Sequence, residues 1–508
     1  MIEIFENLAV GLYAVLTPVG MAAITLGVVA GVVLGAVPGL SVTMVIALFM
    51  PISFTLQPLE GMALLLGLYI GGMSGGLIPS VLLNIPGTPS NVATCFDGYP
   101  MTQKGQAMKA LGAGLVASFV GTLVSVVVMI FASVTIARFA LNFGPFEYFA
   151  IALFALSLIG SLAGKSMIIG LLAGLLGMLI ASSGMAPIDG SIRFNFGNVQ
   201  LTSALDVLVV LVGVFALAEI MSNAETTRRE TGNTALHIDN KGVKGFGFSM
   251  KEFKEQVPNL TRSTGLGVGL GVLPGIGGTT INLLAYSVAK TRSKHSEKFG
   301  TGIMDGVIAT ESSNSASIGG AMVPLLSLGI PGDIPTAMLL GGLMIHGLTP
   351  GPLLFVEETT LIYGIFVSMA IACVIMLAVQ FFGVRLFVKV LKIPRYIMMP
   401  IIFTMCIVGA FGVNNRVFDT FIVIIFGVVG YLFSKFKIPV GPFIMGFILG
   451  PMVETFFRRA LMLSQGDYSP FITRPISAVF LVGTAVILVT LIVKRLKARA
   501  NKTEGVST

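Results

Sequence analysis

The chain has 508 residues, of which 55% are hydrophobic and only 11% are charged, and its mean hydropathy is +0.95. These values exclude a soluble globular protein and predict an integral membrane protein that lies in the lipid bilayer. The net charge of +8 does not indicate nucleic-acid binding, because the basic residues gather at the boundaries of apolar stretches rather than along one amphipathic face.

Apolar stretches long enough to cross a membrane recur along the whole chain. In chain order they lie around residues 8–36, 107–135, 146–186, 204–221, 303–328, 359–382, 396–434 and 475–493. At about 20 residues for each helical crossing, they predict an all-α polytopic membrane protein with roughly 10–12 transmembrane helices and additional broken or re-entrant segments. The start, MIEIFENLAVG, has no basic residue and does not resemble a secretory signal peptide, so we expect the first helix to remain in the mature protein.

Polar and basic segments suggest how the chain is organised. A polar stretch at 223–262 reads as a cytoplasmic linker between a first transmembrane repeat, residues 1–222, and a second, residues 263–508. The last apolar stretch is followed by five basic residues, which predict a cytoplasmic C-terminal tail: Lys494, Arg495, Lys497, Arg499 and Lys502.

Four Pro/Gly breaks interrupt the apolar regions. They are VPGLS at 37–41, NIPGTPSN at 84–91, LPGIGGTT at 273–280 and GIPGDIPT at 329–336. Proline removes a backbone donor from a helix, so backbone groups freed at membrane depth need other partners, usually in a ligand-binding cavity. Paired breaks in two halves of a chain are typical of alternating-access transporters.

The prolines of the two halves follow one another in the same order at similar intervals, which predicts an internal repeat. Pro38 pairs with Pro274, Pro79 with Pro324, Pro86 with Pro331, and Pro187 with Pro439. The repeats are parallel or inverted according to the number of spans between them, which the sequence leaves open; the predicted fold takes the inverted form. The stretch 263–289 either crosses once or turns back at Pro274 as a re-entrant hairpin, and we favour the hairpin because basic loops flank it on both sides.

Neutral polar residues cluster at the breaks, while lysine and arginine are nearly absent from the apolar cores. Backbone N–H groups, hydroxyls and amides can hold a carboxylate without a basic side chain. We therefore predict a substrate site formed by Asn84, Gly87, Thr88, Ser90, Asn91, Ser312, Asn314, Ser315, Gly332 and Thr336. The alternative is that such residues only cap kinks and join helices.

A coupling cation would need oxygen ligands. The predicted set is Ser41, Thr43, Thr279, Thr280 and Glu311. Glu311 lies in a long apolar run, where an acid is costly and usually functional, although it could instead cap a helix beside a loop. Asp333 directly follows a Pro-Gly pair and reads as the N-cap of a helix that starts near Pro335. No metal site and no cofactor are expected, because the histidines lack partners at ligand spacing.

Motifs of enzymes and of ATP-driven pumps are absent from the sequence. No nucleophile elbow, HExxH, phosphate-binding loop or CxxC occurs, and Cys95, Cys373 and Cys406 stand singly in or beside apolar segments. The sequence therefore predicts no enzyme, and it leaves an ion gradient, Na⁺ or H⁺, as the energy source.

Three long motifs resemble those of the large membrane subunit of the tripartite tricarboxylate transporters, the TctA type. They are LLNIPGTPSNVATCFDGYPMTQKGQA at 82–107, SKHSEKFGTGIMDGVIATESSNSASIGGAMVPLLSLGIPGD at 293–333, and LMIHGLTPGP at 343–352. The family commonly has a proline before the acid and an asparagine pair after it. This chain has Thr310 before Glu311, keeps the first amide as Asn314, and has a hydroxyl, Ser315, in place of the second.

The resemblance implies the permease subunit of a binding-protein-dependent secondary transporter in the bacterial inner membrane. Such a subunit works with a small four-helix membrane subunit and a periplasmic substrate-binding protein, and imports citrate-like di- or tricarboxylates by cation symport. The alternative is a self-sufficient ion-coupled carboxylate carrier that needs no binding protein. A passive anion channel would need rings of charge, and an intramembrane enzyme a nucleophile with its base; neither pattern is present.

Overall fold

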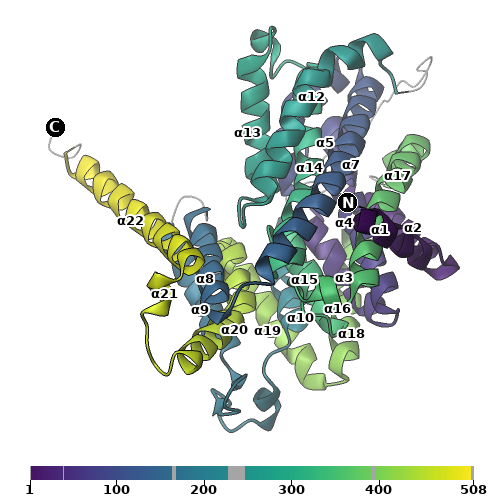
Figure 1. Cartoon of the computed structure of the whole chain (residues 1–508). Coiled ribbons are helices and arrows are strands. Elements are labelled where there is room, and N and C mark those ends of the chain that lie inside the picture. The colour runs from purple at the N-terminus through teal and green to yellow at the C-terminus, as the bar shows by residue number, and fades with distance from the viewer. Residues whose placement is uncertain (1, 38, 163–166, 227–245, 391–394, 505–508) are drawn as a thin grey trace. The chain divides into compact units, whose positions relative to one another are not determined.

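The computed structural model describes residues 2–504 except 38, 163–166, 227–245 and 391–394, so the middle of the predicted linker lies outside the described residues. The described chain is almost entirely helical (Figure 1). It forms two compact units. The first unit consists of residues 1–138 and 208–431, and the second of residues 139–207 and 432–508. Each unit therefore combines a segment from before the predicted linker with a segment from after it.

The elements of the first unit fall into the two parts of its chain. The N-terminal part holds α1 (Ile2–Val15), α2 (Pro18–Gly35), α3 (Val42–Phe54), α4 (Pro58–Gly75), α5 (Leu77–Leu83), η1 (Pro89–Asn91), α6 (Thr94–Gln103) and most of α7 (Ala107–Ala140). The later part holds α10 (Val207–Leu211), η3 (Val212–Leu217), α11 (Ala218–Thr226), α12 (Met250–Gly271), α13 (Gly277–Arg292), η5 (Ser296–Lys298), α14 (Met304–Leu328), α15 (Ile334–Ile345), α16 (Leu354–Glu357), α17 (Thr359–Val390), α18 (Arg395–Asn414) and most of α19 (Val417–Lys435).

The second unit is smaller. It contains α8 (Pro145–Leu162), α9 (Met167–Ala181), η2 (Val199–Ser203), α20 (Val440–Leu463), α21 (Pro470–Thr473) and α22 (Pro475–Glu504). Two short strands, β1 (Gly184–Met185) and β2 (Ile192–Arg193), pair antiparallel, with Gly184 opposite Arg193. Helix α20 packs against α8 and α9, so this unit also joins residues that are distant in the sequence.

Six helical segments in the described chain are long and apolar enough to cross a membrane, which makes this a multi-pass membrane protein. They are Pro18–Gly35, Pro58–Leu83, Ala107–Ala140, Thr359–Gly383, Val417–Lys435 and Val440–Leu463. Further apolar helices of 10–17 residues accompany them: Val42–Phe54, Pro145–Leu158, Ile168–Ala181, Val207–Ser222, Ile334–Ile345, Met399–Gly412 and Pro475–Thr490.

Three predicted apolar stretches prove to contain two helices each. The stretch 8–36 is divided between α1 and α2, 146–186 between α8 and α9, and 396–434 between α18 and α19. In the first case the cause is local, because the Thr17 hydroxyl accepts a hydrogen bond from the Gly20 N–H at 3.0 Å and Pro18 takes the first position of α2. A Thr-Pro pair of this kind starts a new helix without interrupting the apolar run.

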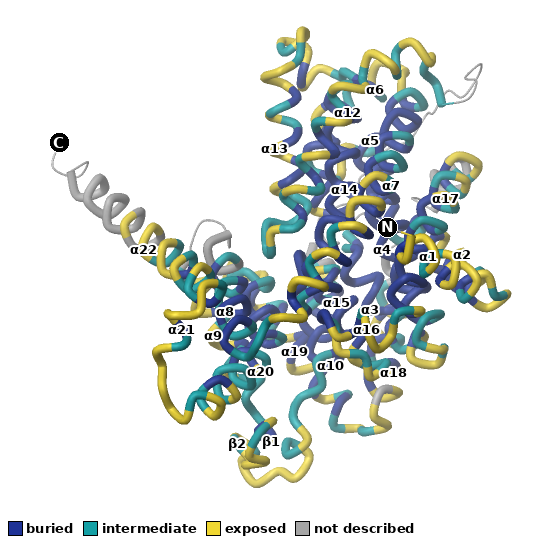
Figure 2. The backbone as a smooth tube through the Cα atoms, viewed as in Figure 1, coloured by how far each residue is buried: buried dark blue, intermediate teal, exposed yellow. Residues whose placement is uncertain are grey.

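Glycines bring two pairs of helices close together in the first unit. On α2, a Cβ at Gly31 or Gly35 would lie within 3.0 Å of a carbonyl oxygen of α4. On α12, a Cβ at Gly267 or Gly271 would lie within 3.0 Å of a carbonyl oxygen of α14. These glycines occupy the same positions relative to Pro38 and Pro274. The backbone of α14 is thereby packed tightly against α12, and nearly all of α14 is buried (Figure 2).

The helices break at both Ile-Pro-Gly sequences, as predicted. Helix α5 ends at Asn84, which is left-handed with φ 58°, and α14 ends at Gly329 with φ 72°. In each case the N–H of the following isoleucine bonds back to a proline carbonyl, Ile85 to Pro79 at 3.4 Å and Ile330 to Pro324 at 3.1 Å. Asparagine and glycine are the residues that tolerate this left-handed C-terminal position.

The chain also turns back at Pro274, so the stretch 263–289 is a helical hairpin and not one continuous helix. Helices α12 and α13 pack side by side and are joined by the short turn at residues 272–276 (Figure 1). The N–H of Gly275 in this turn donates to the carbonyl of Gly332 at 2.7 Å. Two of the predicted breaks are thus in direct main-chain contact.

Candidate functional site

Glu311 lies in the middle of α14 with 0% of its surface exposed. Its Oε1 accepts hydrogen bonds from Asn91 Nδ2 at 2.9 Å and from Thr94 Oγ1 at 2.6 Å, and its Oε2 accepts one from Ser118 Oγ at 3.1 Å. All three donors are neutral, and no ion pair of Glu311 is present among the residues that the structure describes. A mid-helix carboxylate bonded to three other elements is not a helix cap.

One of these donors, Asn91, belongs to the break at 84–91, whereas Thr94 lies on α6 and Ser118 on α7. The Thr88 hydroxyl donates to Asn91 Oδ1 at 2.5 Å and lies 2.9 Å from the Ser90 hydroxyl. Asn91 therefore uses its amide oxygen within the break and its amide nitrogen on Glu311, which ties η1 to α14. We name Thr88, Asn91, Thr94, Ser118 and Glu311 the Glu311 cluster.

Asn314 has the opposite character. It lies one turn along α14 from Glu311, it is 0% exposed, and neither its amide oxygen nor its amide nitrogen has a hydrogen-bond partner. A Cβ placed on Gly278, in the first turn of α13, would lie 3.2 Å from Asn314 Oδ1 and 2.8 Å from Ser90 Cβ. Ser90 of the break at 84–91, Asn314 of α14 and the start of α13 are thus brought together.

In the break at 329–336 the polar side chains bond to one another. Asp333 is the N-cap of α15, as predicted: its Oδ1 accepts from the Thr336 N–H at 2.9 Å and from the Thr336 hydroxyl at 2.7 Å. Asp333 Oδ2 accepts from the Tyr69 hydroxyl at 3.0 Å. Thr336 is therefore occupied in a capping box. Gly332 packs against Ala321, where a Cβ would lie 2.7 Å from the Ala321 Cα.

The remaining predicted substrate residues are placed in different ways. Asn84 is exposed at the left-handed end of α5, and Gly87 packs against Gly76. Ser315 is buried on α14 with an unpartnered hydroxyl, whereas the Ser312 hydroxyl donates to the Ala309 carbonyl of its own helix at 3.4 Å. Among these four, Ser315 is the buried residue whose polar side-chain group has no partner.

The four hydroxyl residues of the predicted cation set lie at helix N-termini. Ser41 is the N-cap of α3 and Thr43 is in its first turn, while Thr279 and Thr280 are in the first turn of α13. The partial positive charge at a helix N-terminus favours an anion over a cation. Glu311 is the one member of the set that brings a negative charge.

Two further acids in the first unit were missed by sequence reasoning. Glu219 on α11 accepts a hydrogen bond from the Ser41 hydroxyl at 2.6 Å. Asp97 on α6 is 1% exposed, and its Oδ1 accepts from the N–H groups of Gly300, Gly302 and Ile303 at 2.8–3.2 Å. The signal for Asp97 was present, since the glycine pair in FGTG can expose successive N–H groups to one acceptor.

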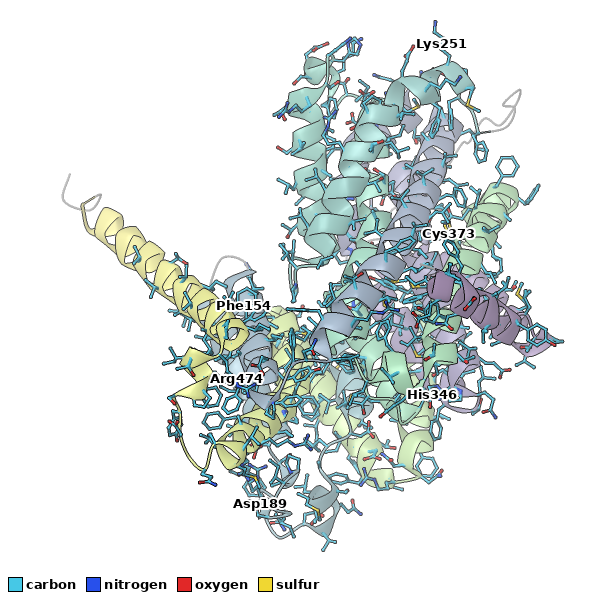
Figure 3. All side chains as sticks on the ribbon, viewed as in Figure 1. Phe154, Asp189, Lys251, His346, Cys373 and Arg474 are labelled. Atoms are coloured by element: carbon cyan, nitrogen blue, oxygen red, sulfur yellow. The ribbon has the colours of Figure 1, made fainter. Side chains whose placement is uncertain are left out.

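The second unit holds ion pairs and an apolar cavity. Arg193 binds both carboxylate oxygens of Glu454 at 2.9 and 3.0 Å, and Arg458 binds Asp189 at 2.9 Å. Hydrogen bonds from Ser191 and Arg458 lower the pKa of the exposed Asp189 to about 2 (Asp189 is labelled in Figure 3). A cavity of about 320 Å³ lies beside Glu454 and is lined mainly by apolar side chains. No group of three or more potential metal ligands occurs in the described chain.

Comparison with known proteins decides the family. Residues 21–445 match the Tripartite tricarboxylate transporter TctA family. This chain belongs to the TctA family. TctA proteins are transport components and not enzymes, and no cofactor of the family is known. Family membership agrees with the multi-pass membrane fold.

Two proteins of Agrobacterium vitis are similar to this TctA chain. One, described as an uncharacterized 52.8 kDa protein in the TAR-I ttuC' 3'region, is 35% identical over 494 residues, which cover 97% of both chains. The other, an uncharacterized protein in the TAR-II ttuC' 3'region, is 37% identical over 209 residues, 41% of this chain and 86% of its own length. No solved structure matches the chain.

Proposed function

We propose that this TctA protein is the permease subunit of a binding-protein-dependent secondary transporter that imports citrate-like di- or tricarboxylates by cation symport. The observation that carries the proposal is the pairing of two groups on α14. Glu311 is a buried carboxylate held by neutral donors, and Asn314, one turn away, is a buried amide with no partner. The first suits a coupling cation, and the second suits a polar substrate.

The cation is assigned to Glu311 on energetic grounds. A carboxylate taken out of water loses several kcal/mol of solvation, which hydrogen bonds from neutral groups recover only in part. A proton or Na⁺ at Glu311 supplies the missing positive charge. A site that is empty in one step of the cycle and occupied in another couples the cation gradient to the movement of the protein.

The two copies of the proposed repeat meet at this site. Segment η1 of the first copy packs against α13 and α14, while α15 of the second packs against α3 and α4. The segment that follows the Ile-Pro-Gly sequence in each copy therefore packs against helices of the other copy. These contacts, together with the glycine contacts at matching positions of α2 and α12, support two copies related by a two-fold axis. We retain the inverted orientation, the repeat boundaries at 1–222 and 263–508, and alternating access about the breaks.

The partners and location follow from the family. We propose a bacterial inner-membrane complex with a small four-helix subunit and a periplasmic binding protein that delivers the carboxylate, with the C-terminus of this chain in the cytoplasm. The alternative is a self-sufficient ion-coupled carrier. Uptake of radiolabelled citrate and succinate, measured with and without a periplasmic binding protein of the same organism that binds these acids, separates the two: uptake that persists at full rate without a binding protein favours the alternative.

Glu311→Gln tests the coupling assignment. The amide keeps the shape and still accepts hydrogen bonds, but it has no charge to pair with a cation. We expect accumulation against a gradient to be lost, while downhill exchange of labelled for unlabelled substrate is retained. Glu252→Gln, on the half-buried Glu252 that pairs with Lys109, is the control and should behave as wild type. An unchanged dependence of accumulation on Na⁺ and pH in Glu311→Gln would contradict the assignment.

A further inference from the structure

We infer that a carboxylate group of the transported anion is bound by the first turn of α13 together with the side chains of Asn314 and Ser90. This subsite rests on the proposed import of carboxylates and gives it an atomic location. Of the ten residues of the predicted site it keeps Ser90 and Asn314, and it adds the first turn of α13.

The Asn314 amide is the first part of the argument. An unpaired buried amide costs roughly 1–3 kcal/mol, and native proteins contain few of them without a reason. The contrast with Asn91 is informative, because that asparagine is equally buried and uses both of its amide atoms. The missing partner of Asn314 is therefore expected to be a ligand that is present only in part of the transport cycle.

The start of α13 is the second part. This helix has 16 residues, and the N–H groups of its first turn have no carbonyl partner within the helix. It begins in a glycine-rich turn in which Gly275 and Gly277 have positive φ values of 85° and 67°. Gly278 has no side chain, and a Cβ there would lie 2.8 Å from Ser90 Cβ and 3.2 Å from Asn314 Oδ1, so the backbone of this first turn lies directly against both residues. Such a helix start binds anions through its N–H groups and its dipole.

The chemistry of the three groups selects a carboxylate. The hydroxyl of Ser90 and the N–H groups of α13 are donors, and a carboxylate oxygen is only an acceptor. Asn314 turns its Oδ1 towards Gly278, so its amide group must turn over to present Nδ2 to the anion. The Ser90 hydroxyl now lies 2.9 Å from the Thr88 hydroxyl, and its proton can rotate towards an incoming anion. Because these donors are neutral, the anion is held firmly enough to be selected and weakly enough to be released.

The position beside Glu311 explains coupling to the cation. Glu311 and Asn314 are three residues apart on one helix, so their side chains are neighbours. A substrate carboxylate at Asn314 and an ionised Glu311 repel each other across a buried, weakly screened distance. The anion therefore binds best when a cation or proton neutralises Glu311, and by linkage the anion in turn strengthens cation binding.

The test combines uptake with stability. Asn314→Leu keeps the side-chain volume but removes both amide groups. We expect uptake of labelled citrate, succinate, malate or glutarate, whichever the wild type transports with its two partner subunits, to fall at least about tenfold, as for loss of a hydrogen bond to a charged group. The unfolding temperature of the purified protein should be unchanged or higher, since an unpaired amide contributes nothing to folding. Asn91→Leu should lower it.

A second variant tests the α13 side of the subsite. Gly278→Ala places a methyl group between Ser90 and Asn314 and should also reduce uptake about tenfold or more. Gly269→Ala is the matched control, because a Cβ at Gly269 on α12 meets nothing within 4 Å. Wild-type uptake by Gly278→Ala and Asn314→Leu, or a lower unfolding temperature for Asn314→Leu, overturns the subsite. Transport of none of the four acids by the wild-type chain overturns the proposed function instead.

Discussion

Asp97 holds a loop in place with a single carboxylate. Its Oδ1 accepts hydrogen bonds from the N–H groups of Gly300, Gly302 and Ile303. Its Oδ2 accepts one from the Tyr286 hydroxyl of α13 at 3.0 Å. Phe96 and Phe299 pack edge-on against the Tyr286 ring on either side. Asp97 of α6 thus holds the C-terminal half of α13, through Tyr286, and the loop that leads into α14. These two helices also carry Gly278 and Asn314.

Asp97→Ala should destabilise the protein strongly. The substitution leaves three backbone N–H groups and one hydroxyl without an acceptor, and removal of charge-assisted hydrogen bonds from a buried site costs about 3 kcal/mol or more in free energy of unfolding. Chemical or thermal unfolding in detergent measures this cost. Glu297→Ala, in the same loop but 69% exposed at its side chain, is the control and should stay within about 0.5 kcal/mol of wild type. Equal stability of the two variants would show that the Asp97 contacts are dispensable.

The close contact between α12 and α14 depends on glycines on the face of α12 that packs against α14. A methyl group on Gly267 would lie within 3.0 Å of the Ser313 carbonyl oxygen. The methyl carbon is fixed on the backbone of α12 and the oxygen belongs to the backbone of α14, so neither can rotate away. Since Asn314 follows Ser313 directly, the position of the proposed subsite depends on this contact.

Gly267→Ala is therefore expected to cost about 1–3 kcal/mol in free energy of unfolding, because the two helices must separate to admit the methyl group. Uptake should decrease with it. Gly265→Ala, on the same helix, adds a methyl group where nothing lies within 4 Å and should leave both quantities unchanged. Unfolding measurements on the two purified variants decide the matter, and a stable Gly267→Ala protein would mean that the helices are not locked at this point.

Local signals in the sequence predicted the helix breaks well, and the partners of the site residues much less well. Proline and glycine act on their own backbone, so Pro86, Pro274 and Pro331 marked real interruptions of the helices. The roles of Asn84 and Asn314 could not be separated in the same way. Both are asparagines in polar clusters, but one caps a helix at the surface and the other is buried without a partner. That difference depends on which helix packs opposite, and sequence periodicity does not contain this information.

At the scale of the whole chain, neither half supplies a complete packing unit. Helix α1 packs against α17, α3 against α15, and α8 and α9 against α20. Each of these contacts joins a segment before the polar stretch 223–262 to a segment after it. The predicted boundaries divide the sequence into two similar pieces, whereas the compact units each draw on both pieces.

Splitting the chain between residues 232 and 233 should consequently give two fragments that are unstable alone and associate when they are made together. Each fragment expressed separately exposes helix faces that the other one covers, and it should be degraded or aggregate. A tag on the first fragment should recover the second from detergent extracts after co-expression. Stable, monodisperse fragments that do not copurify would contradict this expectation.

The hydrogen bond from the Gly275 amide to the Gly332 carbonyl joins two corners of the chain through main-chain atoms alone. No side-chain replacement can delete either atom, short of a proline at position 275. Whatever side chains surround the proposed subsite, this bond between the turn that leads into α13 and the corner that leads into α15 can be kept. Substitutions can therefore change which anion is selected without breaking the main-chain contact between these two corners.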